Sequence, residues 1–345
     1  PWKVTSVNVS LADDQVEVQV QHGGGKLKCP KCGQVCPGYD KRSRRWRHLD
    51  TCQLKTLLVA DVPRVECKEH GVVTVEVPWA EPGSGFTALY EALVIDWLKT
   101  AAVSAVAERL RLSWNAVDGI MQRAVRRGLS RRKTIQPKRL SVDETAYRKG
   151  HDYITVVTDQ ESGTVLHVAE DRLTTSLGSF YEQLDEVQLS GIEVVCMDMW
   201  PAYIKATRQA IEGADRKIAF DRFHVAQYLG KGVDQVRRDE HRQLLKEGDQ
   251  QLKGTKYQCL RNPTNLSWHQ RRAFTSLRKS SLKTARAWAM KEFAAQLWHY
   301  QQRTWALKGW KRLMNWMVRS RLAPMKKVAA TLKSHLWGII NAVVL

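Results

Sequence analysis

Two glycine-terminated motifs near the start of the chain constrain its fold most strongly. Cys29 and Cys32 are separated by two residues and followed by glycine, and Cys67 and His70 repeat this arrangement. Three thiolates and one imidazole make a closed tetrahedral ligand set for structural Zn²⁺. Apolar residues alternate with polar ones between residues 4 and 20, which predicts two strands beside this site. We therefore expect a small zinc-binding β domain over residues 1–80; inert cysteines in two surface turns are the alternative.

The charge balance points to a polyanionic partner. The chain holds 55 Lys and Arg against 35 Asp and Glu, a formal charge of +20, which favours nucleic acid over the alternative of a basic housekeeping protein. A secreted disulfide scaffold would be shorter, and no apolar run reaches the roughly 18 residues that span a membrane. We expect a cytoplasmic, nucleoid-associated protein without a membrane partner. We expect Cys36 and Cys52 to bind no metal, although Cys36 could replace a ligand.

Two basic segments are candidates for contact with DNA phosphates. The first mixes cations with an aromatic residue, which suits phosphate contact and stacking; its candidates are Lys41, Arg42, Arg44 and Arg45. A solvated charged loop is the alternative for this segment. The second, residues 123–139, holds eight Lys and Arg and no acid; its candidates are Arg123, Arg126, Arg127, Arg131 and Arg132.

Residues 86–136 show the pattern of a helix-turn-helix domain. Apolar spacings of three and four predict helices over 89–98, 103–110 and 114–127, and Ser113 is placed to cap the third. That helix would lie in the major groove of double-stranded DNA. Its exposed polar residues include Ser113, Asn115 and Gln122. An ordinary helical hairpin is the alternative, since this pattern is common.

From residue 138 the sequence becomes rich in strands. The predicted order is three strands, a helix, a strand, a helix and a last strand, over 140–145, 153–158, 164–169, 173–184, 192–198, 199 onward and 218–221. This is the order of a ribonuclease-H-like α/β domain. The chain is therefore predicted to be a multi-domain α+β protein.

Two aspartates at strand ends are the candidate catalytic residues. In this strand order the strands that carry Asp143 and Asp198 lie side by side, so their carboxylates would face one another. Two close carboxylates repel unless a cation lies between them, and Mg²⁺ or Mn²⁺ prefers such oxygen ligands. Two such ions hold the attacking and leaving oxygens of a phosphodiester displacement. The alternative is that each aspartate caps the turn or helix that follows.

Residues 227–336 are predicted to form a helical insertion, and residues 340–345 a strand. The insertion holds six tryptophans among many cations. Packing between helices is favoured for these tryptophans because such side chains are usually buried. Stacking on DNA ends or flipped bases, with cations on the phosphates, is the alternative.

These features together resemble the ISL3 family of bacterial insertion-sequence transposases over nearly the whole chain. The specific segments are Ser-Val-Asp143-Glu-Thr-Ala-Tyr-Arg-Lys-Gly-His, Cys-Met-Asp198-Met-Trp-Pro-Ala-Tyr and Phe-Asp221-Arg-Phe-His224-Val. The resemblance implies a ribonuclease-H-like DDE domain, placed here over residues 138–345, with Asp143 as its first acid and Asp198 as its second. It also implies a zinc-binding domain that helps to recognise inverted repeats, and cut-and-join chemistry on transposon ends.

Asp221 and His224 match a motif that many such transposases carry before a helical insertion. Asp221 would cap the next helix or reach the metal site, and His224 would contact DNA or stabilise the pocket; a cap and a packed histidine are the alternative. The family's third acid is a Glu after the insertion, whereas residues 293–345 hold no Asp or Glu. We expect the chain to stop before that acid and to cut DNA poorly. Weaker candidates for the third acid are Glu240, Glu247 and Glu292.

The expected function is therefore a transposase that binds the inverted repeats of an insertion sequence, as a homo-oligomer on DNA, and cuts them with Mg²⁺ or Mn²⁺. One alternative is a DNA-binding regulator without catalysis, such as an inactive truncated copy. Another is a nuclease that cuts RNA hybrids or branched DNA and ignores the repeat sequence.

Overall fold

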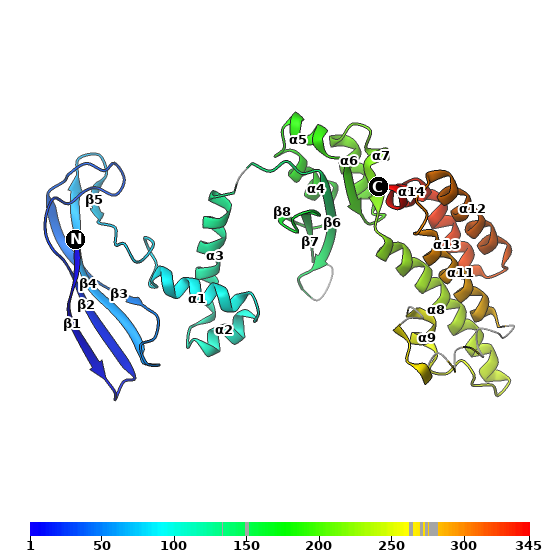
Figure 1. Ribbon diagram of the computed structural model, residues 1–345, viewed down its shortest axis with the longest axis horizontal. Helices are drawn as coiled ribbons and strands as arrows, with labels where there is room; N and C mark the ends of the chain where they lie inside the picture. Colours follow the sequence, from blue (N-terminus) through cyan, green and yellow to red (C-terminus); the bar gives the residue numbers. More distant parts are fainter. Residues whose placement is uncertain (133, 149–151, 262–264, 270–271, 273–274, 276–281) are drawn as a thin grey trace. The chain divides into compact units, whose positions relative to one another are not determined.

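The computed structural model describes residues 1–345 except 133, 149–151, 262–264, 270–271, 273–274 and 276–281 (Figure 1). The Lys-Gly-His end of the first specific segment, residues 149–151, lies outside the described residues, as does Lys133. The chain forms two compact units, Pro1–Lys133 and Thr134–Leu345. In the described part of the chain, every helix is too short or too polar to cross a membrane.

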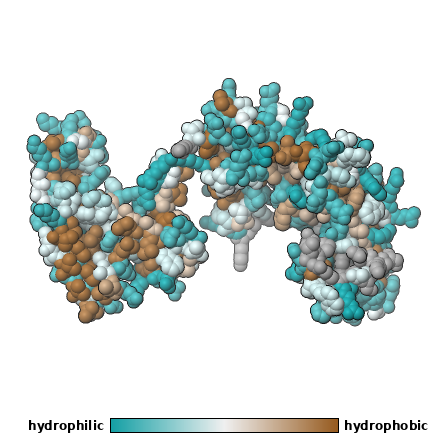
Figure 2. All heavy atoms as spheres, in the orientation of Figure 1, coloured by the Kyte–Doolittle hydropathy of each residue, from teal (hydrophilic) through white to brown (hydrophobic). Residues whose placement is uncertain are grey.

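The first unit begins with a sheet in the strand order β1-β2-β4-β3, with β5 paired to β4. Its strands are β1 (Trp2–Ser10), β2 (Gln15–His22), β3 (Gly38–Arg47), β4 (Lys55–Cys67) and β5 (Gly71–Thr74). The predicted hairpin near the N-terminus is confirmed, with Val9 opposite Val16. Figure 2 shows an apolar area over this sheet, and the exposed side chains of β1 include Val4, Val7 and Val9.

The basic segment after the first cysteine motif is a strand rather than a solvated loop. It forms most of β3, which pairs antiparallel with β4 from Gly38 opposite Val65 to Arg47 opposite Leu57. Trp46 points from this strand into the core, where it is buried and meets the Trp79 ring edge-on at 5.4 Å between ring centroids. The pairing with β4 and this aromatic contact outweigh the polar character of the segment.

Three helices complete the first unit and confirm the predicted helix-turn-helix. They are α1 (Ala88–Leu98), α2 (Val103–Arg109) and α3 (Trp114–Ser130). The Ser113 hydroxyl accepts a hydrogen bond from the Ala116 amide at 3.1 Å, which is the predicted cap of α3. The apolar positions that predicted the helices meet in one core, where Val94, Val106 and Ile120 are buried.

The second unit contains a five-stranded sheet in the order β10-β9-β6-β7-β8. Its strands are β6 (Arg139–Ala146), β7 (Tyr153–Asp159), β8 (Val165–Glu170), β9 (Val194–Met197) and β10 (Ile218–Phe220). β6, β7 and β8 pair antiparallel, whereas β9 and β10 run parallel to β6. The helices between these strands are α4 (Thr174–Tyr181), α5 (Glu186–Gly191), α6 (Pro201–Ala210) and α7 (Ala214–Lys217). The carboxyl ends of β9 and β10 therefore lie side by side.

Helices follow β10 to the end of the chain (Figure 1). They include α8 (Arg222–Lys246), α9 (Lys256–Leu260), α11 (Lys283–Leu297), α12 (Arg303–Arg319), α13 (Ala323–Ser334) and α14 (Leu336–Val344). Trp288 and Trp310 are buried between these helices, as helix packing predicts, whereas Trp268 and Trp305 are exposed. The insertion tryptophans therefore divide between packing and surface positions.

The strand predicted over residues 340–345 is wrong, because α14 covers most of it. Asn341 is fully buried and donates hydrogen bonds to the carbonyls of Asp215 and Ile218, at 2.8 and 2.7 Å, while Arg303 donates to its side-chain oxygen. Gly338 lets the helix approach the Phe220 ring of β10, where an added Cβ would come within 2.5 Å of ring carbons. These long-range contacts favour helix over the strand propensity of the run.

Candidate functional site: a zinc cluster and a carboxylate cluster

The four predicted zinc ligands come together in the first unit. Ligand atoms of Cys29, Cys32, Cys67 and His70 all lie within 4.8 Å of one another. The two sulfur atoms of Cys32 and Cys67 are 3.7 Å apart, and His70 Nδ1 lies 3.5 Å from the Cys67 sulfur. The turns depend on Gly33 and Gly71, whose φ angles of +75° and +64° suit glycine. Thiolate and imidazole donors at this spacing fit structural zinc.

The short distances in this cluster shift the pKa values of its cysteine thiols. A hydrogen bond with the His70 side chain lowers the pKa of the Cys67 thiol to about 6. The backbone of Gln34 lowers the pKa of Cys32, but burial and the neighbouring thiols raise it to about 11. Cys36 is buried in the same apolar cluster and donates to the Gln34 carbonyl at 3.5 Å, and Cys52 is exposed in a turn. Both lie outside the four-residue ligand group.

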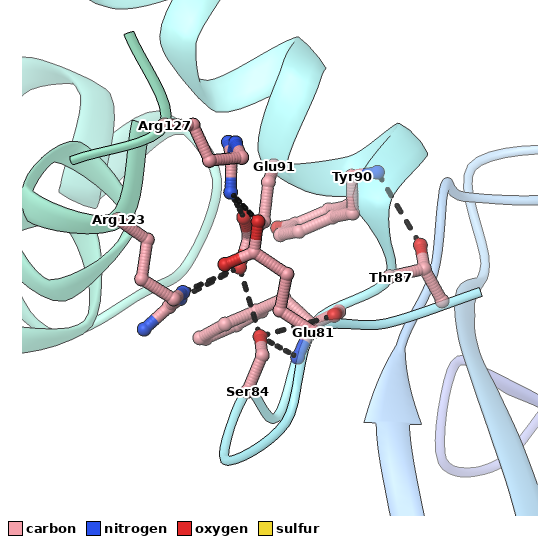
Figure 3. Close-up of polar contacts among 8 residues, drawn as sticks. Glu81, Ser84, Thr87, Tyr90, Glu91, Arg123 and Arg127 are labelled. Carbon is pink, nitrogen blue, oxygen red and sulfur yellow. Dashed lines mark hydrogen bonds and ion pairs between the residues drawn. The ribbon is translucent and has the colours of Figure 1, made fainter. Parts of the chain in front are cut away.

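Two of the predicted phosphate-binding arginines are engaged inside the first unit (Figure 3). Arg123 Nε donates to a Glu91 oxygen at 2.8 Å, and Arg127 donates to Glu91 at 3.0 Å and to Glu81 at 2.6 Å. Glu91 is 2% exposed and also accepts from the Ser84 hydroxyl at 2.8 Å. A buried carboxylate needs such partners, so this cluster joins α3 to α1 and to the segment before it.

The remaining candidates on this unit lie mainly at the surface. Ser113, Asn115 and Gln122 are exposed on α3, and Gln122 donates to Asp118 at 2.7 Å. On β3, Arg45 lies 3.7 Å from Glu17. Among the other predicted DNA-contact residues, Arg44 and Arg132 are partly buried, and the exposed ones are Lys41, Arg42, Arg126 and Arg131.

In the second unit, one histidine lies between the two predicted catalytic aspartates. His224 Nε2 is 3.8 Å from an Asp143 oxygen, and its Nδ1 is 3.6 Å from an Asp198 oxygen. The strand register explains the meeting, because Ser141 on β6 is paired with Cys196 on β9 and each aspartate follows two residues later. Three elements, β6, the end of β9 and the first turn of α8, therefore place their side chains at one point.

Asp221 has a different position in this arrangement. Its carboxylate accepts a hydrogen bond from the Phe223 amide at 2.8 Å and so caps α8. This is the capping role weighed for it, and it fixes the first turn of α8 from which His224 extends.

A third carboxylate, Glu144, lies beside the aspartates, and sequence reasoning missed it. Burial raises the pKa of the Glu144 carboxyl, and the charges of Asp198 and Asp143 raise it further. One Glu144 oxygen is buried and has no hydrogen-bond partner among the described residues. The other lies 3.7 Å from Arg172, which is only a weak ion pair. A buried carboxylate oxygen without a donor, beside two further carboxylates, is a site that a divalent cation fits.

Arg172 is itself held firmly in place. Its guanidinium carbon lies 4.2 Å from the Tyr153 ring centroid and 4.4 Å from that of Trp200, so two aromatic rings hold it. Trp200 Nε1 also donates to the Arg172 carbonyl at 2.9 Å. The sequence around Arg172 does not indicate these ring contacts, because Tyr153 lies on β7 and Trp200 directly precedes α6.

Comparison with known proteins decides the family. The transposase model of the ISL3 family matches residues 140–344, which is more than half of the chain. The chain belongs to the ISL3 transposase family. Two further models match its first unit: a helix-turn-helix domain of ISL3 transposases over residues 75–125, and a transposase zinc finger over residues 26–70. The predicted family, zinc cofactor and helix-turn-helix are thus confirmed, and the chain is a DNA transposase with DNA-binding and zinc-binding domains.

Curated relatives agree with the ISL3 assignment. The transposase for insertion sequence element IS1557 from Mycobacterium tuberculosis is 28% identical over 343 residues, which cover 89% of this chain and 74% of the relative. The transposase for insertion sequence element IS1001 from Bordetella parapertussis is 27% identical over 319 residues, covering 91% and 78%. The DDE transposase domain of the family implies a divalent catalytic metal.

Two of the three weaker candidates for the third acid have partners of their own in this ISL3 chain. Glu240 is buried and accepts hydrogen bonds from the Lys283 and Thr284 amides, both at 2.7 Å, so it caps α11. Glu247 is exposed at the end of α8. Glu292 lies 2.7 Å from Lys291.

Proposed function

We propose that Asp143 and Asp198 form the DNA-cutting centre of this transposase, in a ribonuclease-H-like domain that begins near residue 138. The strand order β8-β7-β6-β9-β10, with three antiparallel strands followed by two parallel ones, supports this fold. The observation that carries the proposal is the approach of both carboxylates to His224 from separate elements. Two carboxylates from separate strands that converge on one partly exposed histidine are the kind of arrangement found at functional sites.

The residues of the centre have separate roles in this proposal. Asp143, Asp198 and the free oxygen of Glu144 would hold Mg²⁺ or Mn²⁺. These ions supply charge neutralisation at the scissile phosphate and make water or a 3′-OH a better nucleophile. His224, whose two ring nitrogens face the two aspartates, orients both carboxylates. Arg172, fixed between two rings, compensates the negative charge of the cluster.

The first unit would bring the transposon ends to this centre. We propose that α3 enters the major groove of the terminal inverted repeats, where Ser113, Asn115 and Gln122 face the bases. Two sets of basic residues would contact the phosphates. The set on β3 is Lys41, Arg42, Arg44 and Arg45. The set near the end of α3 and just after it is Arg126, Arg131 and Arg132. Arg123 and Arg127 are left out because Glu91 and Glu81 bind them. Pairs of inverted ends favour a homo-oligomer on DNA.

A nicking assay tests the proposal. Supercoiled DNA that carries the inverted repeats of the chain's own element should be cut only with Mg²⁺ or Mn²⁺. Asp143→Asn should remove cutting without weakening binding of the zinc-loaded chain to the same DNA, measured without added Mg²⁺ or Mn²⁺. Asp239→Asn is the matched control, because Asp239 is an exposed carboxylate on α8.

Two results would contradict the proposal: cutting without divalent metal, or equal cutting by Asp143→Asn and the wild-type chain. Binding of the repeats with no cutting in either metal would favour the DNA-binding regulator instead.

A further inference from the structure

A groove of about 720 Å³ opens between α8, α9 and α11 and reaches the first turn of α8. These helices lie side by side in the second unit (Figure 1). Arg222 and Phe223 line its mouth and directly precede His224 in the sequence. The groove therefore includes the first turn of α8, from which His224 extends to the aspartates. Its volume is that of a site for one or two small organic groups, too small for a double helix.

Small side chains form much of the groove wall. Ala226 and Gly230 come from α8, and Ala294 and Ala295 come from α11. An added Cβ at Gly230 would already contact a Leu260 methyl carbon at 3.5 Å, so a larger side chain there would narrow the groove. Small side chains on both helices leave room for a ligand between them.

Two aromatic side chains line this space and differ in exposure. Phe223 is 66% exposed at the mouth. Trp298 is partly buried, since its ring meets Trp310 edge-on at 5.2 Å and lies 5.3 Å beneath the Arg222 guanidinium. An exposed ring next to a fixed one is an arrangement on which nucleic-acid bases stack.

The charge around the groove is positive and is left uncompensated. Its acids already have partners, because Asp234 lies 2.8 Å from Arg237, and Glu292 pairs with the adjacent lysine. Lys231 and Lys256, by contrast, have no carboxylate partner among the residues described, and neither has Arg222. Cations without acids at the rim attract a ligand with phosphate groups.

Helix α8 links the groove to the carboxylate cluster. His224 faces the aspartates. One turn later, the pKa of Tyr228 is raised, first by burial and then by the charges of Asp198 and Glu144. The adjacent face of the same helix, with Phe223 and Lys231, lines the groove. The first turns of α8 therefore carry residues of the carboxylate cluster on one face and residues of the groove on the next.

We propose that this groove binds unpaired nucleotides of the DNA strand that continues from the phosphate to be cut. Bases would stack on Phe223 and Trp298, and phosphates would lie against Arg222, Lys231 and Lys256. This inference rests on the proposed function, because it requires the carboxylate cluster to hold the scissile phosphate.

The test compares two DNA probes with the full, zinc-loaded chain and no added Mg²⁺ or Mn²⁺, so that cutting is excluded while the zinc cluster stays intact. One probe is a fluorescent DNA hairpin with a blunt end, and the other is the same hairpin with a single-stranded tail of five thymidines. Fluorescence anisotropy should show about tenfold tighter binding of the tailed hairpin, the effect of stacking one base. Phe223→Ala should bring the two affinities together, and Lys231→Gln should weaken the salt dependence of the tail's contribution.

Trp305→Ala is the matched control. Trp305 is also an exposed aromatic residue with a lysine over its ring, at 4.8 Å, but it lies on α12 outside the groove. The Trp305→Ala variant should still bind the tailed hairpin more tightly than the blunt one. Photocrosslinking with 5-iododeoxyuridine in the tail should, in addition, label the segments around Phe223 or Trp298.

Equal binding of both hairpins by the wild-type chain would overturn the proposal, as would an equal loss in Phe223→Ala and Trp305→Ala. The test is separate from that of the cutting centre. A tail preference in a chain that does not cut would support the groove alone, and metal-dependent cutting without a tail preference would refute the groove alone.

Discussion

Replacing Glu91 with glutamine tests whether the buried ion pairs hold the helix-turn-helix together. The Glu91 side chain is 2% exposed and accepts three hydrogen bonds, from Ser84, Arg123 and Arg127. Breaking one side of a buried ion pair costs about 3–5 kcal/mol. The lower end applies here, because Arg127 keeps Glu81 and is 31% exposed. We expect a loss of about 3 kcal/mol in the stability of the three helices.

Hydrogen exchange of the full chain measures this loss directly. A decrease of about 3 kcal/mol in the free energy of opening should speed exchange of the α1 and α3 amides roughly a hundredfold. Asp96→Asn is the control on the same helix, since the Asp96–Lys99 pair is 3.0 Å long but 73% and 69% exposed, and such pairs contribute little. Unchanged exchange in Glu91→Gln, or an equal change in both variants, would refute the reasoning.

Three further predictions concern the zinc cluster, a histidine and a close helix contact. Cys67→Ser should lose zinc, measured by elemental analysis of the purified chain, whereas Cys52→Ser should keep it. Burial, then Arg47, lowers the pKa of His48 below its ordinary value, so the unfolded chain takes up that proton first as pH falls. Stability of the first unit should therefore decrease from pH 7 to pH 5.5, and His48→Gln should flatten this dependence in pH-dependent unfolding. Gly338→Ala should cost about 1–3 kcal/mol by overpacking against Phe220, seen as a lower melting temperature of the second unit; an unchanged melt would contradict that contact.

Local patterns were enough to predict much of the architecture. The two cysteine motifs, the Ser113 cap and the apolar spacing of α1 to α3 all depend on residues close in sequence. The order of strands and helices along the second unit could also be predicted from short segments, each with its own apolar pattern. The pairing of β6 with β9 then placed Asp143 and Asp198 together, since both follow paired residues by two positions.

Interactions between distant segments account for what was missed. Arg123 and Arg127 look like solvent-facing cations until Glu91, 32 and 36 residues away, is placed beside them. The final apolar run forms α14 because Asn341 finds partners in the segment around α7 and β10. Successive side chains on a strand point to opposite faces, so the sequence gives no reason to group Glu144 with Asp143. Its buried oxygen and its neighbours are visible only in three dimensions.

Mn²⁺ binding measured by electron paramagnetic resonance tests the central claim most directly. Free Mn²⁺ gives a sharp spectrum that is lost on binding, so titration of the zinc-loaded chain reports the carboxylate cluster without DNA. We predict that Asp143→Asn and Asp198→Asn each weaken Mn²⁺ binding at least about tenfold, while Asp239→Asn leaves it unchanged. Equal Mn²⁺ binding by the wild-type chain and both cluster variants would contradict a shared metal site at these aspartates.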